Sequence, residues 1–422
     1  MSPLPSEGNL KFLWAYCSSL FVFRLFCRMQ QSMASRGWSP VLITPLFSVH
    51  LKARSQRIPC HLIESGRPER HYEGLDVETT RESLQRLSPI ADLQRFQASV
   101  LSTLEGLTSH KLPSAVAVFN GMDAGSRAML SFAHHLGIPT LVLELGNIDS
   151  KLLADPAGFN AASILAKNPE LLDSWQVSEE EFSAWLARFK TQRLVVNRLP
   201  QAKISRSLNP YYALDRLAAR ILGIPQPLVV PVGKKIASKI QVHRIPSIPE
   251  LRPASPYVFL PLQVTADMNL LAMSDLGNLA AVEIAARRAR ELVCDLVVKM
   301  HPAETDRAVV QEIERVCAER GHLLTSLNTT ELILGATEIV TINSTAGLEA
   351  LLYGKKVTTL GRCMYREFSA SRARAYVLRY LIDFDPFGSA PMSLAAFDRM
   401  LERLEIGANH PHLSSVSPSH SP

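Results

Sequence analysis

The sequence lacks the features that would assign a class of protein at once. Its six cysteines form no C-x-x-C pair, which argues against a metal ribbon and against a disulfide framework. It has no dense run of Lys and Arg, so extensive binding to nucleic acid is not favoured. No stretch reaches the roughly 20 apolar residues that a membrane-spanning helix needs. The scattered cysteines are best explained as buried thiols in a reducing cytoplasm.

The composition is that of a globular protein with an excess of positive charge. Hydrophobic residues make up 47% and charged residues 20% of the 422 residues, a length that suits two domains. The net charge of +6 suits an anionic partner such as a nucleotide, an acidic sugar or an anionic membrane surface. The most apolar N-terminal stretch, residues 20–28, predicts a helix that faces the core, with a membrane-surface helix as the alternative.

Apolar runs alternate with helical patterns along the chain and predict an α/β fold with parallel sheets. This alternation is interrupted at residues 195–256, where nine prolines indicate a linker, and it resumes after residue 256. We therefore predict two Rossmann-like domains that face a cleft, the GT-B architecture. The expected domains are an acceptor-side N-terminal domain at 1–245, a donor-side C-terminal domain at 246–404 and a disordered tail at 405–422.

Reactive side chains follow three of the predicted strands in the second half of the chain. These strands lie near residues 258–262, 295–300 and 338–342. In an open α/β sheet, ligands bind outside the carboxyl ends of the strands. We expect the following residues to meet there in one crevice: Gln263, Asp267, His301, Pro302, Asn343, Ser344 and Thr345.

The His301-Pro302 step suggests a phosphate contact. Pro302 restricts the backbone, and the His301 ring could then donate a hydrogen bond to a phosphate oxygen of a leaving nucleotide. The alternative is an ordinary loop histidine. No Asp-x-Asp lies near these strand ends and His301 has no partner at metal-ligand spacing, so we expect a reaction that needs neither metal nor cofactor.

Residues 343–349 suggest a nucleotide site without a Walker sequence. Asn343, Ser344 and Thr345 precede a predicted helix, whose first N–H groups could bind an anion. Gly347 would allow a phosphate or a neighbouring backbone to come close, and Glu349 could bind ribose hydroxyls. The alternative is that Ser344 and Thr345 simply cap the helix.

Two carboxylates are candidates for the chemistry itself. Asp267 could act as a general base or as a nucleophile at an anomeric carbon, with Gln263 orienting it or the sugar; a turn or cap role is the alternative. Asp275 competes with it but fits a helix cap better. Glu144, at the end of a first-half strand, could bind or deprotonate an acceptor hydroxyl, or could be a plain surface carboxylate. Weaker candidates of the same kind are Asn120, Asp123, Asp155 and Asn160.

At these residues the sequence resembles the capsule polysaccharide biosynthesis family of bacteria, the KpsS/KpsC and LipA/LipB type, whose members are β-Kdo transferases. The resemblance covers roughly residues 10–385 and is strongest after residue 257. The matching pieces are Leu260-Pro-Leu-Gln263-Val-x-x-Asp267, Lys299-Met-His301-Pro302, Ile342-Asn343-Ser344-Thr345-x-Gly347-Leu-Glu349-Ala350-Leu-x-x-Gly354-Lys355, Leu360-Gly361-x-x-x-Tyr365, and Glu144-x-Gly146 followed by Asp155-x-x-Gly158-x-Asn160.

The resemblance implies a GT-B fold, CMP-Kdo as donor substrate and no metal. It implies that Asp267 is the catalytic carboxylate and that His301 and Pro302 hold the CMP phosphate. Asn343, Ser344 and Thr345 would hold the nucleotide. Family members keep the β configuration of the donor, so Asp267 would be the nucleophile of a double displacement, while a base role stays open.

The expected function is therefore transfer of Kdo from CMP-Kdo to a lipid or saccharide acceptor in capsule assembly. The expected place is the cytoplasmic face of the inner membrane, in peripheral association with other capsule-assembly proteins. One alternative is a transferase that uses another nucleotide sugar, such as CMP-sialic acid or a UDP-sugar. The other is a non-catalytic binding protein of polysaccharide export, which would bind no nucleotide.

Overall fold

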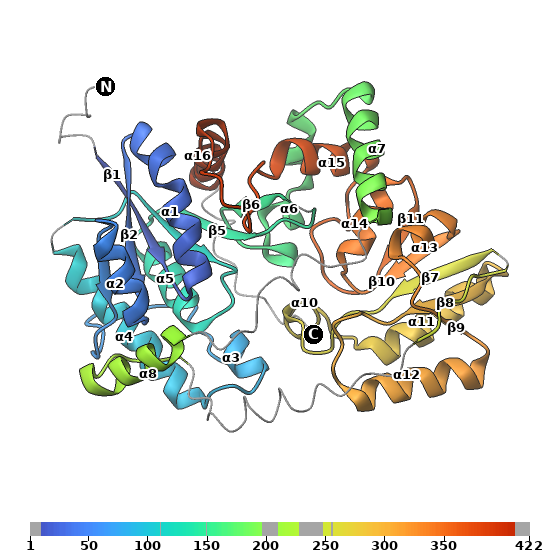
Figure 1. Ribbon diagram of the computed structural model, residues 1–422, viewed down its shortest axis with the longest axis horizontal. Helices are drawn as coiled ribbons and strands as arrows, with labels where there is room; N and C mark the ends of the chain where they lie inside the picture. The colour runs from blue at the N-terminus through green and yellow to red at the C-terminus, as the bar shows by residue number, and fades with distance from the viewer. Residues whose placement is uncertain are drawn as a thin grey trace. The chain divides into compact units, whose positions relative to one another are not determined.

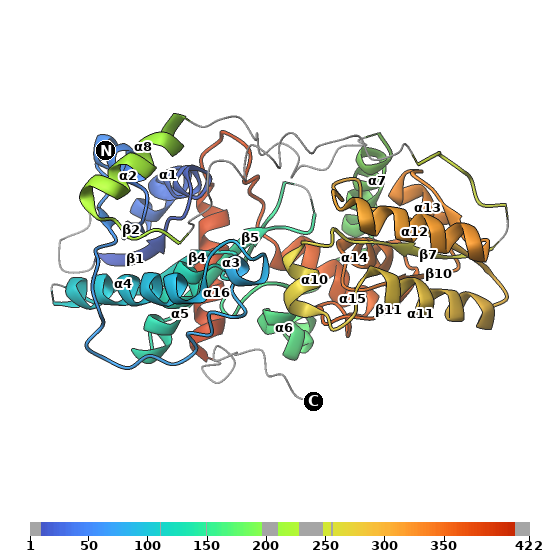
Figure 2. The same ribbon diagram turned by 90° about the horizontal axis from the view of Figure 1, so that it is seen from below.

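The chain forms two compact units, each assembled from separate stretches of sequence (Figures 1 and 2). The computed structural model describes residues 10–109, 111–148, 150–195, 210–227, 248–254 and 256–409. Unit 1 comprises Met1–Ile164, Ile204–Val230 and Leu381–Pro422, and unit 2 comprises Leu165–Lys203 and Pro231–Tyr380. Each unit therefore contains residues from before and after residue 245, the predicted domain boundary.

Unit 1 is built on a six-stranded sheet in the order β3-β2-β1-β4-β5-β6, the strand order of a Rossmann fold. Neighbouring strands are parallel except for β5 and β6, which are antiparallel. The strands are β1 (Lys11–Tyr16), β2 (Trp38–Thr44), β3 (Cys60–Leu62), β4 (Ala115–Phe119), β5 (Thr140–Leu145) and β6 (Leu152–Asp155). The helices are α1 (Leu20–Ser35), α2 (Phe47–Ser55), α3 (Arg81–Leu84), α4 (Ile90–Thr108), α5 (Ala124–His135), η2 (Asn160–Ala162), α8 (Pro210–Leu222) and α16 (Leu394–Asn409), with α6 (Ile164–Lys167) at the unit boundary.

Helices cover both faces of this sheet, so its strands are apolar on both sides. Alternate residues of β1 point in opposite directions: Leu13 and Ala15 pack with α1, α2 and α16, whereas Trp14 and Tyr16 pack with α4 and α5. Residues 20–28 fall within α1, which buries Val22, Phe23, Leu25 and Phe26. The prediction of a core-facing helix there is confirmed.

Unit 2 repeats the arrangement with a five-stranded, wholly parallel sheet in the order β11-β10-β7-β8-β9. Its first strand, β7, lies in the middle, as in unit 1. The strands are β7 (Tyr257–Pro261), β8 (Asp295–Lys299), β9 (Leu323–Leu324), β10 (Glu338–Thr341) and β11 (Lys356–Thr359). The helices are η3 (Pro169–Ser174), α7 (Glu179–Val195), α10 (Met268–Met273), α11 (Asn278–Glu291), α12 (Arg307–Arg320), α13 (Thr329–Gly335), α14 (Thr345–Leu352), α15 (Ala370–Ala375) and the π-helical turn η5 (Tyr376–Tyr380).

The unit 2 sheet is also covered on both faces. Val258 and Leu260 of β7 pack with α11 and α12, and Phe259 packs with α13 and α14. Two sheets of mainly parallel strands, each with helices on both sides, confirm the predicted α/β fold with two Rossmann-like halves. The cleft between them stays a prediction.

Three local expectations need correction. Part of the predicted linker, Pro210–Leu222, is the helix α8, because proline is tolerated in the first turn and good helix formers follow it. The rest of the linker lies largely outside the described residues. The last helix, α16, continues past residue 404 to Asn409, while residues 410–422 of the predicted tail lie outside the described part. The antiparallel strand β6 at residues 152–155 was not among the predicted strands.

Candidate active site

The predicted site residues of unit 2 gather at the carboxyl edge of its sheet, around the point where the strand order reverses. The chain runs outward from β7 in both directions, through β8 to β9 on one side and through β10 to β11 on the other. The switch point therefore lies between β7 and β10, where ligands bind in folds of this kind. Gln263 follows β7 and Asn343 follows β10, so these two residues flank the switch point directly.

Gln263 and Asn343 are bonded to each other. Gln263 Nε2 donates to Asn343 Oδ1 at 2.9 Å, and the Asn343 N–H donates to Gln263 Oε1 at 3.3 Å. Asn343 Nδ2 also donates to the carbonyls of Asn269 and Arg362, at 2.8 and 3.2 Å. Both side chains are buried. They hold the strand ends and the following loops together, and any contact with a nucleotide would be made by the loops that they fix.

Asp267 begins the short helix α10. Its Oδ1 accepts the Asn269 N–H at 2.7 Å, as the cap interpretation predicts. The side chain is half-buried, and Oδ2 has no hydrogen-bond partner among the residues that the structure describes. The cap interaction therefore leaves one carboxylate oxygen of Asp267 open for chemistry. Asp275, its competitor, caps no helix: Gly277 is the N-cap of α11, and Asp275 pairs with Arg362 at 2.8 Å.

His301 follows β8 and lies within electrostatic reach of Asp267. Burial lowers the pKa of its ring below the usual value, while the charges of Asp267 and Glu304 oppose that shift. Nδ1 accepts the Ala303 N–H at 3.1 Å. A neutral ring whose Nδ1 accepts a hydrogen bond must carry its proton on Nε2. His301 can therefore present an Nε2–H donor, while the Pro302 side chain is exposed.

Glu304 is a residue that the sequence interpretation missed. It is only 2% exposed, and its two oxygens serve two loops. Oε2 accepts the N–H and the hydroxyl of Thr265, at 2.7 and 2.8 Å, on the loop that leads to Asp267. Oε1 accepts the N–H groups of Thr305 and Asp306 on its own loop. Burial alone would raise the pKa of Glu304, but the hydrogen bonds outweigh it and lower the pKa.

The signal for Glu304 was its position three residues after His301. That position alone does not distinguish it from an ordinary loop carboxylate, since most Glu side chains are exposed. What sets Glu304 apart is a set of four donors brought from two separate loops, which only the folded structure reveals. Glu304 thereby fixes the loop of Asp267 against the loop of His301.

Ser344 caps α14, as the alternative interpretation predicted. Its hydroxyl accepts the Ala346 N–H at 3.3 Å, and its carbonyl accepts a hydrogen bond from the hydroxyl of Tyr365. Thr345 is exposed at the first position of the helix. A Cβ on Gly347 would lie 2.7 Å from the Tyr365 hydroxyl, so it is this side chain that comes close to Gly347.

Glu349 lies within α14 and is 2% exposed. Arg193 of α7 pairs with its Oε2 at 2.8 Å, and the Thr330 hydroxyl donates to its Oε1 at 2.6 Å. Both carboxylate oxygens are thus engaged inside unit 2. Glu349 therefore links α7 and α13 to α14. A ribose could bind Glu349 only if the Arg193 or Thr330 side chain moved away from it.

Glu144 lies in unit 1 at the end of β5. It is half-buried and accepts hydrogen bonds from the Asn120 side chain and from the Leu145 N–H. Asn120 follows β4 with a positive φ of 69°, a conformation that asparagine adopts more readily than most residues. Glu144 therefore sits at the carboxyl edge of the unit 1 sheet, in keeping with its predicted strand-end position.

The weaker first-half candidates have structural partners. Asp155 is fully buried, and it accepts hydrogen bonds from the N–H groups of Ala157 and Gly158, both at 2.9 Å, and from the Ser163 hydroxyl. Asp123 caps α5 through the N–H and hydroxyl of Ser126. These contacts explain the two carboxylates as organisers of the loops that contain them.

A buried polar cluster in unit 1 was also missed. The Tyr16 hydroxyl, at the end of β1, has no hydrogen-bond partner among the described residues. Burial, followed by the charges of Asp123 and Glu82, raises its pKa well above the usual value. Burial and the neighbouring Asp123 also raise the pKa of Glu82. The Tyr16 ring packs directly on Gly125, where a Cβ would lie only 2.1 Å from it.

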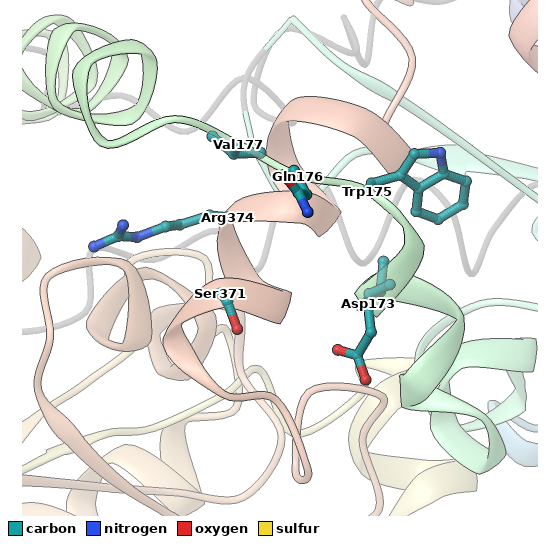
Figure 3. A pocket seen from close by; sticks show the side chains of 7 residues that line it. Asp173, Trp175, Gln176, Val177, Ser371 and Arg374 are labelled. Atoms are coloured by element: carbon teal, nitrogen blue, oxygen red, sulfur yellow. The ribbon is translucent and has the colours of Figure 1, made fainter.

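A pocket of about 420 Å³ in unit 2 lies away from these residues, between the segment after η3 and helix α15 (Figure 3). Its charged side chains already have partners: Asp173 pairs with Arg372 at 2.6 Å, and Arg374 pairs with Glu179. Figure 3 shows Asp173 and Ser371 pointing toward the same gap from opposite sides. None of the predicted site residues lines it.

Two further searches cover only the described part of the chain. Within it, no group of three or more His, Cys, Asp and Glu side chains could hold a metal ion. None of its helices is long and apolar enough to cross a membrane.

The fold is that of an α/β protein with two Rossmann-like units, and sequence comparison gives the family. The family described as "Capsule polysaccharide biosynthesis protein" matches residues 117–372. This is more than half of the chain, and the protein belongs to that family. The predicted resemblance is confirmed.

The individual relatives resemble this protein only over a short stretch or at low sequence identity. Protein FixF of Sinorhizobium fredii (strain NBRC 101917 / NGR234) is 38% identical over 118 residues, which are 26% of this chain and 27% of FixF. The match therefore spans about a quarter of that relative's length. Among solved structures, the Thermosulfurimonas dismutans KpsC β-Kdo 2,7 transferase is 15% identical with a TM-score of 0.42, covering 94% of this chain and 100% of that one. The UDP-GlcNAc 2-epimerase of Methanocaldococcus jannaschii is 12% identical with a TM-score of 0.31, covering 94% and 100%.

Proposed function

We propose that this protein transfers Kdo from CMP-Kdo to a lipid or saccharide acceptor during assembly of a surface polysaccharide. Its family membership supports a role in capsule synthesis. The choice of donor comes from the resemblance of the strand-end motifs to those of β-Kdo transferases. In this proposal the enzyme is metal-independent, needs no cofactor and works as a peripheral protein on the cytoplasmic face of the inner membrane.

One observation carries the proposal. Asp267 has an open carboxylate oxygen, and His301 presents an Nε2–H donor from a loop that Glu304 holds against the loop of Asp267. A nucleophile and a donor for the leaving phosphate are the two groups that a metal-free transfer of a CMP-sugar requires. The N-terminus of α14, with Ser344 and Thr345, offers further N–H groups for the nucleotide.

In the proposed reaction, Asp267 Oδ2 attacks the anomeric carbon of the donor. The bond from that carbon to the phosphate oxygen breaks, and CMP leaves with the bonding electrons while His301 donates a hydrogen bond to the phosphate. An acceptor hydroxyl then attacks the anomeric carbon, loses its proton to a base and frees Asp267. Two inversions keep the β configuration. Glu144 is our candidate for contacting the acceptor hydroxyl.

The test compares Asp267→Asn with Asp275→Asn, a carboxylate eight residues along that pairs with Arg362 at the surface. We expect Asp267→Asn to lower the rate of transfer from CMP-Kdo by roughly 1,000-fold or more, because the nucleophile is lost. Asp275→Asn should keep the wild-type rate. The assay is mass spectrometry of the glycosylated acceptor, with thermal unfolding to show that both variants are folded. Wild-type transfer rates in Asp267→Asn would refute the assigned role.

A thermal-shift series separates the donor alternatives. A ligand that binds only the folded state raises the unfolding temperature, and a tighter ligand at the same concentration raises it more. CMP and CMP-Kdo should therefore stabilise the protein, while UDP-sugars should not. Stabilisation by a UDP-sugar or by CMP-sialic acid alone would point to another transferase. No stabilisation by any nucleotide would favour a non-catalytic binding protein.

A further inference from the structure

Helix α8 differs from an ordinary surface helix, because its acidic residue is buried and several of its aliphatic residues are exposed. Its one acidic residue, Asp215, is turned inward and is 8% exposed. Asp215 accepts the Ser48 N–H at 2.6 Å and the Ser48 hydroxyl at 2.8 Å, at the start of α2. These bonds fix α8 against α2 in unit 1, as the neighbouring positions of the two helices in Figures 1 and 2 show. The carboxylate thus occupies the face that would normally be apolar.

The opposite face of α8 carries aliphatic side chains into solvent. Leu217 is 59% exposed and Ile221 is 71% exposed. Leu214, three residues before Leu217, is 37% exposed, so the spacing of 214, 217 and 221 places these side chains in one stripe along the helix. On the neighbouring helix α2, Leu51 is 44% exposed. Several exposed aliphatic side chains along one stripe of a helix are typical of an interaction site.

Basic residues accompany this stripe. Arg220 on α8 and Arg54 on α2 are exposed, as is Arg57 immediately after α2. Lys52 of α2 lies over the Tyr211 ring at 4.5 Å and joins the two helices. Asp215 is the sole acidic residue of α2 and α8, and it is buried. The outer surface of the helix pair therefore combines exposed aliphatic groups with positive charge and no exposed acidic group.

We propose that α8 and α2 form a docking surface for an anionic lipid bilayer. An amphipathic helix that presents aliphatic side chains between basic ones lies in the plane of the membrane interface, with its apolar face among the acyl chains. Anionic headgroups attract Arg and Lys near the surface, which selects this occupant over a neutral apolar partner. This inference gives the peripheral attachment proposed above a location, and its test requires no sugar transfer.

The experiment is flotation of the full-length protein with vesicles of phosphatidylcholine that contain phosphatidylglycerol, and with vesicles of phosphatidylcholine alone. Wild-type protein should float with the anionic vesicles and remain largely unbound with the neutral ones. The double change Leu217→Ser and Ile221→Ser should weaken binding by roughly tenfold or more, because both side chains lose their transfer into the acyl region. Arg54→Gln with Arg220→Gln should weaken it too and reduce its dependence on salt.

Leu112→Ser is the matched control, since Leu112 is 53% exposed in a unit 1 loop outside α2 and α8. It should bind like wild type. Circular dichroism should show that every variant is folded. Absence of wild-type flotation, or equal flotation of the Leu217→Ser and Ile221→Ser protein, would overturn the proposal. So would light scattering that shows a dimer which those two changes dissociate, because the stripe would then be covered by a second copy. If wild-type protein floats with anionic vesicles but transfers no Kdo, the proposed reaction is wrong and the docking surface is not affected.

Discussion

Glu304 joins the two loops that carry Asp267 and His301. Its four accepted hydrogen bonds come from Thr265 on one loop and from residues 305 and 306 on the other. A carboxylate buried to 2% exposure is stabilised in its charged form only by such donors. At the scale of single residues, the relative position of the open Asp267 oxygen and the His301 donor therefore depends on Glu304.

We predict that Glu304→Gln lowers the transfer rate roughly 10- to 100-fold, because a displacement of about 1 Å in a reacting group has effects of this size. A Gln amide nitrogen cannot accept the hydrogen bonds that a carboxylate oxygen accepts. The negative charge of Glu304 also raises the pKa of His301, so its removal should lower that pKa further. An NMR titration of His301 provides this second measurement. A slower enzyme with an unchanged His301 titration would indicate a purely structural role.

A second residue-scale prediction concerns proton uptake. Burial keeps the His301 pKa below its ordinary value in the free protein, so the ring is neutral at pH 7. A phosphate near Nε2 would favour the cation and raise that pKa. CMP binding should therefore take up a proton, and CMP affinity should increase as pH falls through the window between the free and bound pKa values. Calorimetry in buffers of different ionisation enthalpy measures the uptake. His301→Ala should abolish it; the same uptake in that variant would exclude this histidine as its source.

At the scale of elements, Glu338 joins three parts of unit 2. It begins β10 with 1% exposure and accepts bonds from Arg288 of α11 at 2.9 Å, Lys356 of β11 at 3.1 Å and Thr358 of β11 at 2.7 Å. Burial would raise its pKa, but these donors outweigh burial and lower the pKa to about 2. The strand whose other end leads to Asn343 is thereby anchored at its start.

We predict that Glu338→Gln destabilises the protein by about 3 kcal/mol at pH 7, since the buried carboxylate that pairs with Arg288 and Lys356 is lost. The folded-state pKa lies below the unfolded value, so this contribution is present above pH 4.5 and is lost as pH falls toward 2. The difference in the free energy of unfolding between wild type and Glu338→Gln should therefore shrink as pH falls from 4.5 toward 2. Glu291→Gln removes the exposed partner of Arg288 and should cost little. Urea unfolding at several pH values makes the measurement, and a pH-independent difference would contradict the prediction.

The element scale also shows what sequence patterns can predict. The strands of unit 2 were predictable because continuous β-branched and aliphatic runs, such as Val297–Val298, end abruptly at polar residues. Helix α8 was hidden by the prolines around it, and by Asp215 lying on its buried face where an apolar residue is usual. The strand β6 was missed because four residues beside a turn carry too little periodicity to be recognised.

At the scale of the whole molecule, chain order does not reveal which unit a segment joins. Helix α16 packs with α1 through Met400 and Phe397, although some 360 residues separate them in sequence. Helix α7 likewise joins unit 2 through the Arg193 pair with Glu349. Such partnerships depend on side chains that meet only after folding. The strand-end motifs needed no such information, because a parallel sheet brings all its carboxyl ends to one edge.

The central claim is that the carboxyl edge of the unit 2 sheet binds the nucleotide of the donor through His301. Calorimetric titration with CMP tests it most directly, using wild type, His301→Ala and the control His322→Ala, a histidine after α12 in the same unit. We predict that wild type and His322→Ala bind CMP alike, and that His301→Ala binds roughly tenfold more weakly or worse, as expected for loss of one hydrogen bond to a charged group. Failure of wild type to bind CMP, or equal binding by His301→Ala, would contradict the account.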